Sequence, residues 1–156
     1  MKLQKATAFA LYAVLELAAE PGRQRTAVEI ADKYGISAHH LAKVLRDLGR
    51  AGLVDAVRGV GGGYRFAGNA KRLTLMDVIR LFENTSAEAD EPVPPGEGQD
   101  IAAGLRFVLA ELDVQIGATL CSISLSTMLK LIARRPWESA AAAKPARRSQ
   151  AGRRGR

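Results

Sequence analysis

Residues 57–66, VRGVGGGYRF, are the stretch whose residue types and spacing come closest to a chemical site. Four glycines fall within five positions, with Arg58 before them and Arg65 after them. A glycine-rich loop flanked by positive charge can cradle phosphate, and it can equally form the tip of a β-hairpin. A dinucleotide-binding fingerprint counted from Gly59 needs a glycine where Tyr64 stands, and the stretch has no lysine for a nucleoside-triphosphate loop. The spacing therefore favours a hairpin tip.

The remaining reactive side chains do not form a catalytic group. His39 and His40 are adjacent, so on a helix they diverge by about 100° and do not chelate one ion together. The single cysteine, Cys121, excludes an internal disulfide and a multi-cysteine metal site. It is either a small packing residue or a redox switch. We expect no enzymatic activity, no metal and no cofactor, because the alternative of a nucleotide-dependent enzyme lacks its motif.

Charge is distributed unevenly along the 156 residues, whose formal net charge is +7. Residues 1–72 carry 12 Lys and Arg against 6 Asp and Glu, residues 73–137 carry 5 against 9, and residues 138–156 carry 6 against 1. A basic first half and a basic tail around an acidic middle predict a polyanion-binding unit joined to a different unit. The alternative is a basic protein with a solubilising tail.

The sequence contains no run of 18 apolar residues, so no transmembrane span is expected. Its apolar start is interrupted by Glu16 and Glu20 and lacks the cleavage site of a signal peptide. Together with the single cysteine, these features predict a cytoplasmic protein.

Three helices are predicted in the first part of the chain. The first spans residues 3–19. The second begins at a capping box of Thr26 and Glu29, faces Val28 inward with Ile30 and Ala31, and ends at Gly35. The third, capped by Ser37, carries one apolar stripe formed by Leu41, Val44, Leu45 and Leu48. Two short helices joined by a tight turn are typical of a helix-turn-helix, whose second helix presents its first turns to the major groove of DNA.

The glycine-rich stretch then joins two predicted strands, residues 53–58 and 63–67. Tyr64 and Phe66 share one face of the second strand, so Arg65 points to the other. A hairpin directly after a helix-turn-helix is a wing. The predicted fold class is therefore mostly α with a small β-hairpin wing.

The second half of the chain predicts a helical region. Thr74 and Asp77 mark the start of a short helix, and Ser124 marks the start of the last one. Residues 84–100 are acidic and rich in Pro and Gly, which is typical of a surface loop. The long amphipathic helix predicted over residues 100–120 needs a cover, and a second copy of itself suits that role. The predicted units are a DNA-binding unit (1–72), a dimerisation region (73–137) and a disordered basic tail (138–156).

Five segments resemble, in order, those of a family of bacterial winged-helix transcription regulators that includes IscR, NsrR and CymR. They are MKLQKATAFALYAVLELA, KYGISAHHLAKVLRDLGRAGLVDAV, RGVGGGYR, TLMDVIRLFE and SISLSTML. The resemblance covers roughly residues 1–133, and its most specific part is the block of turn, helix and wing.

The resemblance implies a homodimer that binds a pseudo-palindromic operator in double-stranded DNA, as a repressor. Ser37, His39 and Lys43 fall where the family's recognition helix reads bases or phosphates, and Arg58 falls on the arginine that enters the minor groove. Ala42 stands where IscR carries a base-reading glutamate, so a different sequence preference is expected. The remaining predicted DNA contacts are Lys2, Lys5, Arg46 and Arg65.

The chain departs from the family's sensing members at the loop before the long helix. Those members carry three cysteines there that hold an iron–sulfur cluster, and residues 84–100 contain none. Ala8 stands where NsrR-type members add an aspartate ligand. The resemblance therefore implies a member without a cluster. The alternatives are a redox- or cluster-responsive regulator, or one controlled by a partner protein or small molecule. The arginines of the tail either add non-specific DNA affinity or are dispensable.

Overall fold

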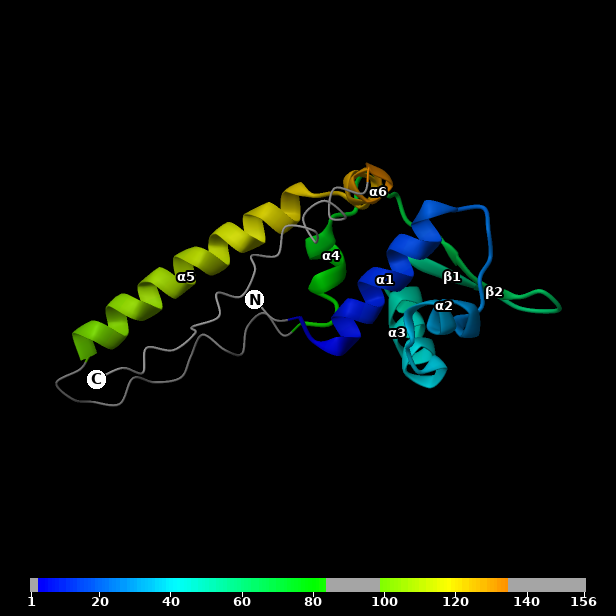
Figure 1. Cartoon of the computed structure of the whole chain (residues 1–156), viewed down its shortest axis with the longest axis horizontal. Helices are drawn as coiled ribbons and strands as arrows, with labels where there is room; N and C mark the ends of the chain where they lie inside the picture. Colours follow the sequence, from blue (N-terminus) through cyan, green and yellow to red (C-terminus); the bar gives the residue numbers. More distant parts are fainter. Residues whose placement is uncertain (1–2, 84–98, 135–156) are drawn as a thin grey trace, which may run out of the picture.

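The computed structural model describes residues 3–83 and 99–134. Its elements, in chain order, are α1 (Lys5–Ala19), α2 (Ala27–Tyr34), α3 (Ala38–Arg50), β1 (Val54–Val57), β2 (Gly63–Phe66), α4 (Leu75–Ile79), α5 (Gln99–Ser122) and α6 (Leu125–Arg134). Helix α5 extends from a body formed by the other elements, and the hairpin tip projects at the opposite end of the long axis (Figure 1). The predicted fold class is confirmed. Lys2, residues 84–98 of the predicted loop and the tail from 138 lie outside the described residues.

Helix α1 lies at the centre of the body. Its Ala10, Ala13 and Val14 are fully buried and Leu17 is nearly so, and the helix contacts α3, α4, α6 and β2. Small alanines let the neighbouring helices approach closely, which suits a core with few aromatic residues. The other fully buried side chains of the core are likewise aliphatic and come from α2, α3, α4 and α6: Ala31, Leu41, Leu45, Leu48, Val78 and Leu125.

Helix α2 begins and ends as its sequence predicts. The Thr26 side chain accepts from the Glu29 N–H and the Glu29 carboxylate accepts from the Thr26 N–H, so the capping box is complete. Gly35 ends the helix in the left-handed region, with φ of 62°. The inward placement predicted for Val28 is wrong: this side chain is 56% exposed, because α2 buries only Ile30 and Ala31.

Helix α3 buries its predicted stripe and exposes the opposite side. Ser37 occupies the N-cap position with extended backbone, but its side chain makes no capping hydrogen bond. Ser37 therefore marks the predicted start of the helix, but the predicted capping hydrogen bond from its side chain is wrong. Its hydroxyl remains at an exposed helix start, where positive partial charge from the helix is concentrated.

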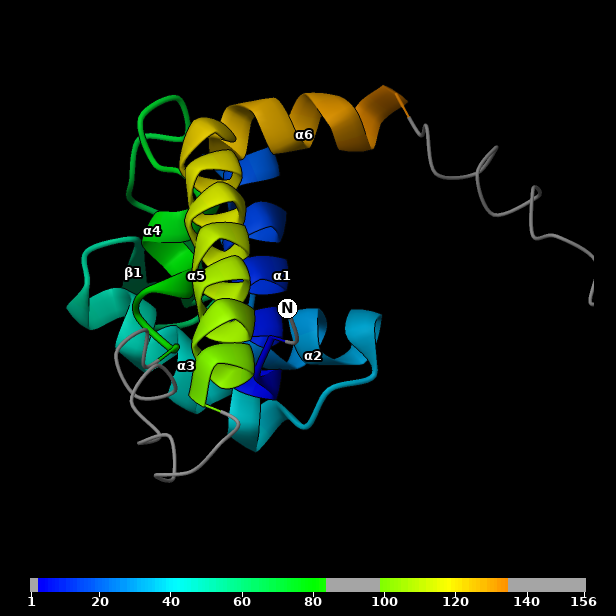
Figure 2. The ribbon, with the colours of Figure 1, turned by 90° about the vertical axis from the view of Figure 1, so that its left-hand side faces the viewer.

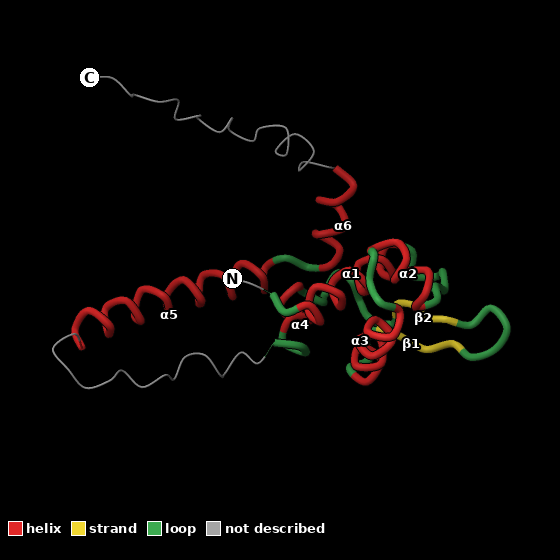
Figure 3. Tube along the Cα trace, turned by 60° about the horizontal axis from the view of Figure 1, so that its bottom comes forward, coloured by secondary structure: helices red, strands yellow, loops and turns green. Residues whose placement is uncertain are grey.

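Strands β1 and β2 form an antiparallel hairpin in which Val54 pairs with Phe66 and Asp55 with Arg65. Arg25 adds a short bridge to the other side of β2, through hydrogen bonds of 2.9 and 2.8 Å with Tyr64. Strand β1 is therefore the outer edge of this small sheet. The helices and the two strands with their long connecting loop are distinguished in Figure 3.

The start of α6 is tied to the start of α4. Thr74 and Asp77 form the capping box of α4, and Thr74 bridges Ser124 at the head of α6. The Ser124 hydroxyl accepts from the Thr127 N–H at 3.1 Å, which confirms the predicted cap. Figure 2 shows α6 crossing the end of α5 above α1. Among the described residues, no helix has the length and apolar character needed to cross a membrane.

Candidate nucleic-acid interface

The exposed side of α3 carries most of the predicted DNA-contacting residues. Ser37 and His39 lie at its start, and Lys43 and Arg46 follow on the next turns, all exposed. Lys43 and Arg46 make no ion pair within residues 3–83 and 99–134. His39, Lys43 and Arg46 therefore line one face of the second helix of a helix-turn-helix, with Ser37 at the start of that helix. Such helices present this part of their surface to the major groove.

The hairpin tip carries Arg58 and is shaped by two glycines. Gly59 and Gly61 have φ of 107° and 77°, conformations that L side chains rarely adopt. Val60 between them is fully exposed. Arg58 lies directly after β1 and is exposed. The tip therefore presents an arginine and glycine backbone without covering side chains, as the sequence predicts for a wing.

Arg65 is exposed on the outer face of the hairpin, but it has a partner that the sequence reading missed. Its Nη2 lies 3.2 Å from Asp55 Oδ2, and both side chains are about half exposed. The two residues are directly paired in the register of the hairpin. A phosphate that uses Arg65 must therefore compete with Asp55.

Three other side chains discussed from the sequence are also exposed. Lys5 is exposed in the first turn of α1. His40 is exposed on α3, with its ring centroid 6.0 Å from that of His39. Cys121 is an exposed free thiol near the end of α5.

A buried acidic group, also missed by the sequence reading, holds α2 and the Arg25 segment against α1. Both oxygens of Glu16 lie 2.8 Å from Lys33 Nζ, the Tyr34 hydroxyl donates to Glu16 at 2.8 Å, and Arg25 lies 3.4 Å away. Burial favours the neutral acid, but the hydrogen bonds from Lys33 and Tyr34 outweigh it and lower the pKa of Glu16. Burial and the bond to Glu16 raise the pKa of Tyr34 to about 12.

We expect Glu16→Gln to lower the free energy of unfolding by about 1–2 kcal/mol at pH 7, because a nearly buried carboxylate with three partners is lost. The pKa of Glu16 is lowered in the folded state, so the ionised carboxylate adds its full contribution to the free energy of unfolding above the unfolded-state pKa of 4.5. This contribution is lost as the pH falls through the folded-state pKa. Urea unfolding between pH 3 and 7 should show wild type and variant converging in acid. The half-exposed Glu20 provides the control, since Glu20→Gln should change stability much less.

The wing passes very close to the Arg25 segment at Gly63. A Cβ built at this position would lie 2.7 Å from the Arg25 carbonyl oxygen. We expect Gly63→Ala to force the Arg25–Tyr64 bridge apart and to destabilise the protein by about 1–3 kcal/mol. Gly22→Ala is the matched control, because nothing lies within 4 Å of a Cβ there. Equal urea midpoints for both variants would show that the bridge adapts without cost.

Helix α5 is apolar on two opposite sides and is largely uncovered. The predicted stripe is exposed at Leu105 (59%), Val108, Leu109 and Leu112. Phe107 and Val114, seven residues apart and 73% and 66% exposed, lie on the other side of the helix. The single apolar stripe predicted from the sequence does not include this second side. Exposed apolar surface of this extent on a helix marks an interaction surface.

Two helices joined by a tight turn, a basic second helix and a hairpin with an arginine at its tip define a winged helix-turn-helix DNA-binding transcription regulator. Residues 3–131 match the model of the family Rrf2, described as "Iron-dependent Transcriptional regulator". The chain belongs to the Rrf2 family, whose members are regulators and not enzymes.

Named relatives agree with this assignment. The chain is 51% identical over 155 residues to the Rhodopseudomonas palustris protein called "Putative HTH-type transcriptional regulator BadM", covering 98% of both chains. The oxidised form of CymR from Staphylococcus aureus is similar in structure, with a TM-score of 0.66, 25% identity and coverage of 83% of this chain and 96% of that one. IscR from T. potens gives a TM-score of 0.64 at 25% identity over 92% of each chain.

The description of the family names iron, so this chain would need side chains that can ligate iron or an iron–sulfur cluster. Iron–sulfur clusters are held by several cysteine thiolates. The full sequence has one cysteine, near the end of α5, and position 8 is an alanine. Residues 3–83 and 99–134 contain no group of three or more His, Cys, Asp or Glu that could hold a metal ion. These residues do not fit a cluster, and no step of the function proposed below passes through one.

Proposed function

We propose that this protein is a cytoplasmic repressor that binds a pseudo-palindromic operator as a homodimer. Residues 1–72 form the DNA-binding unit, and residues 73–137 form the dimerisation region. The observation that carries the proposal is the position of α3, whose apolar stripe is buried while its basic side is exposed next to the wing.

DNA recognition is divided between the helix and the wing. Ser37, His39 and Lys43 on α3 enter the major groove, and Arg58 enters the neighbouring minor groove. Lys2, Lys5, Arg46 and Arg65 add phosphate contacts, which supply affinity without sequence information. Affinity should therefore fall steeply as salt rises, because each phosphate contact releases counterions.

Dimerisation is supported by α5. Its two apolar sides are exposed in one chain, and a single partner helix covers only one side of a helix. The second side, with Phe107 and Val114, therefore packs against the body of the partner. Such an arrangement fixes the distance between the two α3 helices, which in turn fixes the spacing of the operator half-sites.

Repression needs nothing beyond occupancy of the operator, since a bound dimer excludes other proteins from the same DNA. Because the residues present do not fit an iron–sulfur cluster, one alternative for control of the regulator is a partner protein or small molecule that acts at the acidic segment 84–100. Cys121 is an alternative redox input, because it lies on the dimerisation helix and is exposed in the single chain.

Selection of genomic DNA fragments by the purified protein tests the proposal. Fragments retained at 150 mM salt should share one inverted repeat, and each should bind two protomers in a titration monitored by fluorescence anisotropy. Retained fragments with no common sequence would show that binding is not specific and would contradict the proposal.

A further inference from the structure

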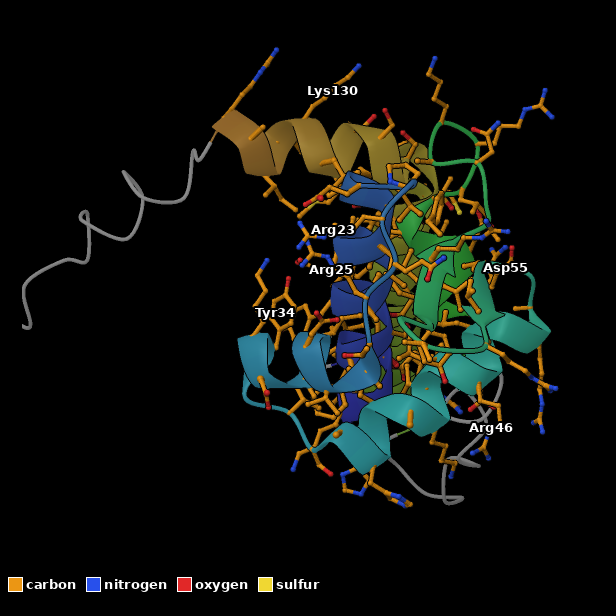
Figure 4. All side chains as sticks on the ribbon, turned by 90° about the vertical axis from the view of Figure 1, so that its right-hand side faces the viewer. Arg23, Arg25, Tyr34, Arg46, Asp55 and Lys130 are labelled. Atoms are coloured by element: carbon orange, nitrogen blue, oxygen red, sulfur yellow. The ribbon has the colours of Figure 1, made fainter. Side chains whose placement is uncertain are left out.

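A hollow of about 400 Å³ lies between the second half of α3 and the hairpin. Its polar rim is formed by Arg46 and Arg50 of α3 and by Asp55 of β1, and Gly49, Ala56 and Tyr64 also line it. Figure 4 shows Arg46 and Asp55 on one side of the body, with Arg25 and Tyr34 on the other. The hollow is therefore distant from the Glu16 group and belongs to the side formed by α3 and the wing.

The hollow lies between the two elements, α3 and the hairpin, that are proposed to contact DNA. If α3 lies in the major groove and the wing tip in the next minor groove, the sugar–phosphate strand between the two grooves must pass between α3 and the hairpin. The hollow occupies that gap, and Gly49 leaves the α3 wall of the gap without a side chain.

The charges around the hollow suit a phosphate. Arg46 makes no ion pair within the described residues, and Arg50 has only a 3.5 Å contact to Asp47, with 75% of the Arg50 side chain exposed. Arginines at positions i and i+4 lie on one side of a helix, and both Arg46 and Arg50 line the hollow. The acid of the rim, Asp55, is already paired with Arg65.

The register of the hairpin adds a backbone donor. Ala67 N–H donates to the Leu53 carbonyl at 3.0 Å, so the ladder hydrogen bonds fall on residues 53, 55 and 57 of the first strand. The N–H of Ala56 is therefore directed away from β2, to the free edge of the sheet that lines the hollow. Edge N–H groups beside guanidinium groups are a recurrent arrangement for binding phosphate oxygens.

We propose that the hollow seats one phosphate of the DNA strand that passes from the major to the minor groove. Arg46 and Arg50 are the cations of this seat, and Asp55 limits its strength by repelling the phosphate and by holding Arg65. The inference rests on the proposed function and adds Arg50 and Asp55 to the residues that determine affinity.

The test uses full-length Arg46→Ala, Arg50→Ala and Asp55→Asn variants, with a selected operator and a random duplex of equal length. Each arginine variant should bind both DNAs about 3–10-fold more weakly and lower the salt slope by about 2 per dimer. Asp55→Asn should bind both about 3-fold more tightly. Lys130→Ala removes one exposed charge from α6, far from the hollow in Figure 4, and should change nothing.

The possible failures are distinguishable. A wild-type protein that binds neither DNA contradicts the proposed function itself. If wild type binds and both arginine variants match Lys130→Ala, the hollow holds no phosphate. If the arginine variants lose affinity only for the operator, these arginines read bases and the proposed phosphate site is wrong. If Asp55→Asn binds DNA more weakly than wild type, the proposed role of Asp55 is wrong. Thermal unfolding of each variant separates these outcomes from misfolding. Inorganic phosphate at matched ionic strength should not displace DNA, and displacement would assign the hollow to a free anion.

Discussion

Replacing Leu105 and Leu112 together by glutamate is expected to convert the protein into a monomer and to weaken operator binding at least about 100-fold. Both side chains are roughly half exposed in the single chain, so the charges cost the folded monomer little. In the proposed dimer the same positions would be buried between two copies of α5, where an unpaired carboxylate is strongly unfavourable. Each half-site is then bound by one protomer alone, and the gain from linking two sites is lost.

Sedimentation equilibrium measures this outcome directly. The matched control is the double change to methionine at the same positions, which keeps the surface apolar and should remain dimeric. Circular dichroism verifies that both variants keep the helix content of the wild type. A glutamate variant that stays dimeric and keeps wild-type operator affinity would remove α5 as the dimer interface.

Replacing Arg58 by alanine is expected to weaken operator binding by about 10–100-fold, the second largest effect, with no change in the urea midpoint. Arg58 is exposed at the start of the hairpin tip, so its removal leaves packing intact. In the proposed dimer two wings would lose their minor-groove contact at once, and each such arginine contributes about 1 kcal/mol or more.

Arg58→Lys keeps the positive charge and separates two roles for the arginine. If the side chain reads a narrow minor groove, lysine recovers only part of the loss, because its more strongly hydrated ammonium group is costlier to place there. Full recovery with lysine would make Arg58 a phosphate contact. An alanine variant with wild-type affinity would show that the wing does not touch DNA.

The features that the sequence predicted correctly are those encoded locally. Thr26 with Glu29 and Thr74 with Asp77 form capping boxes within four residues, and the stripe of α3 follows from helical spacing alone. The position of Arg65 opposite Tyr64 and Phe66 follows from strand alternation. Such patterns depend on few residues and on no distant packing.

The features that were missed depend on contacts between distant segments. Glu16 contacts Lys33 and Tyr34 only because α1 and α2 pack side by side. No periodic pattern in the sequence predicts a buried carboxylate. The Asp55–Arg65 pair required the exact register of the hairpin, which its turn residues leave open. Val28 is apolar and yet exposed, because a helix as short as α2 covers its neighbours with only two side chains, Ile30 and Ala31.

Hydroxyl-radical footprinting of the wild-type protein on a selected genomic fragment tests whether a dimer reads two symmetric half-sites. A dimer that reads a pseudo-palindromic operator should give two protected half-sites related by two-fold symmetry, with centres separated by a multiple of about 10.5 base pairs. Protection should extend into the flanking minor grooves that Arg58 is proposed to enter. Protection of a single half-site, or uniform protection along the fragment, would contradict a dimer that reads a pseudo-palindromic operator.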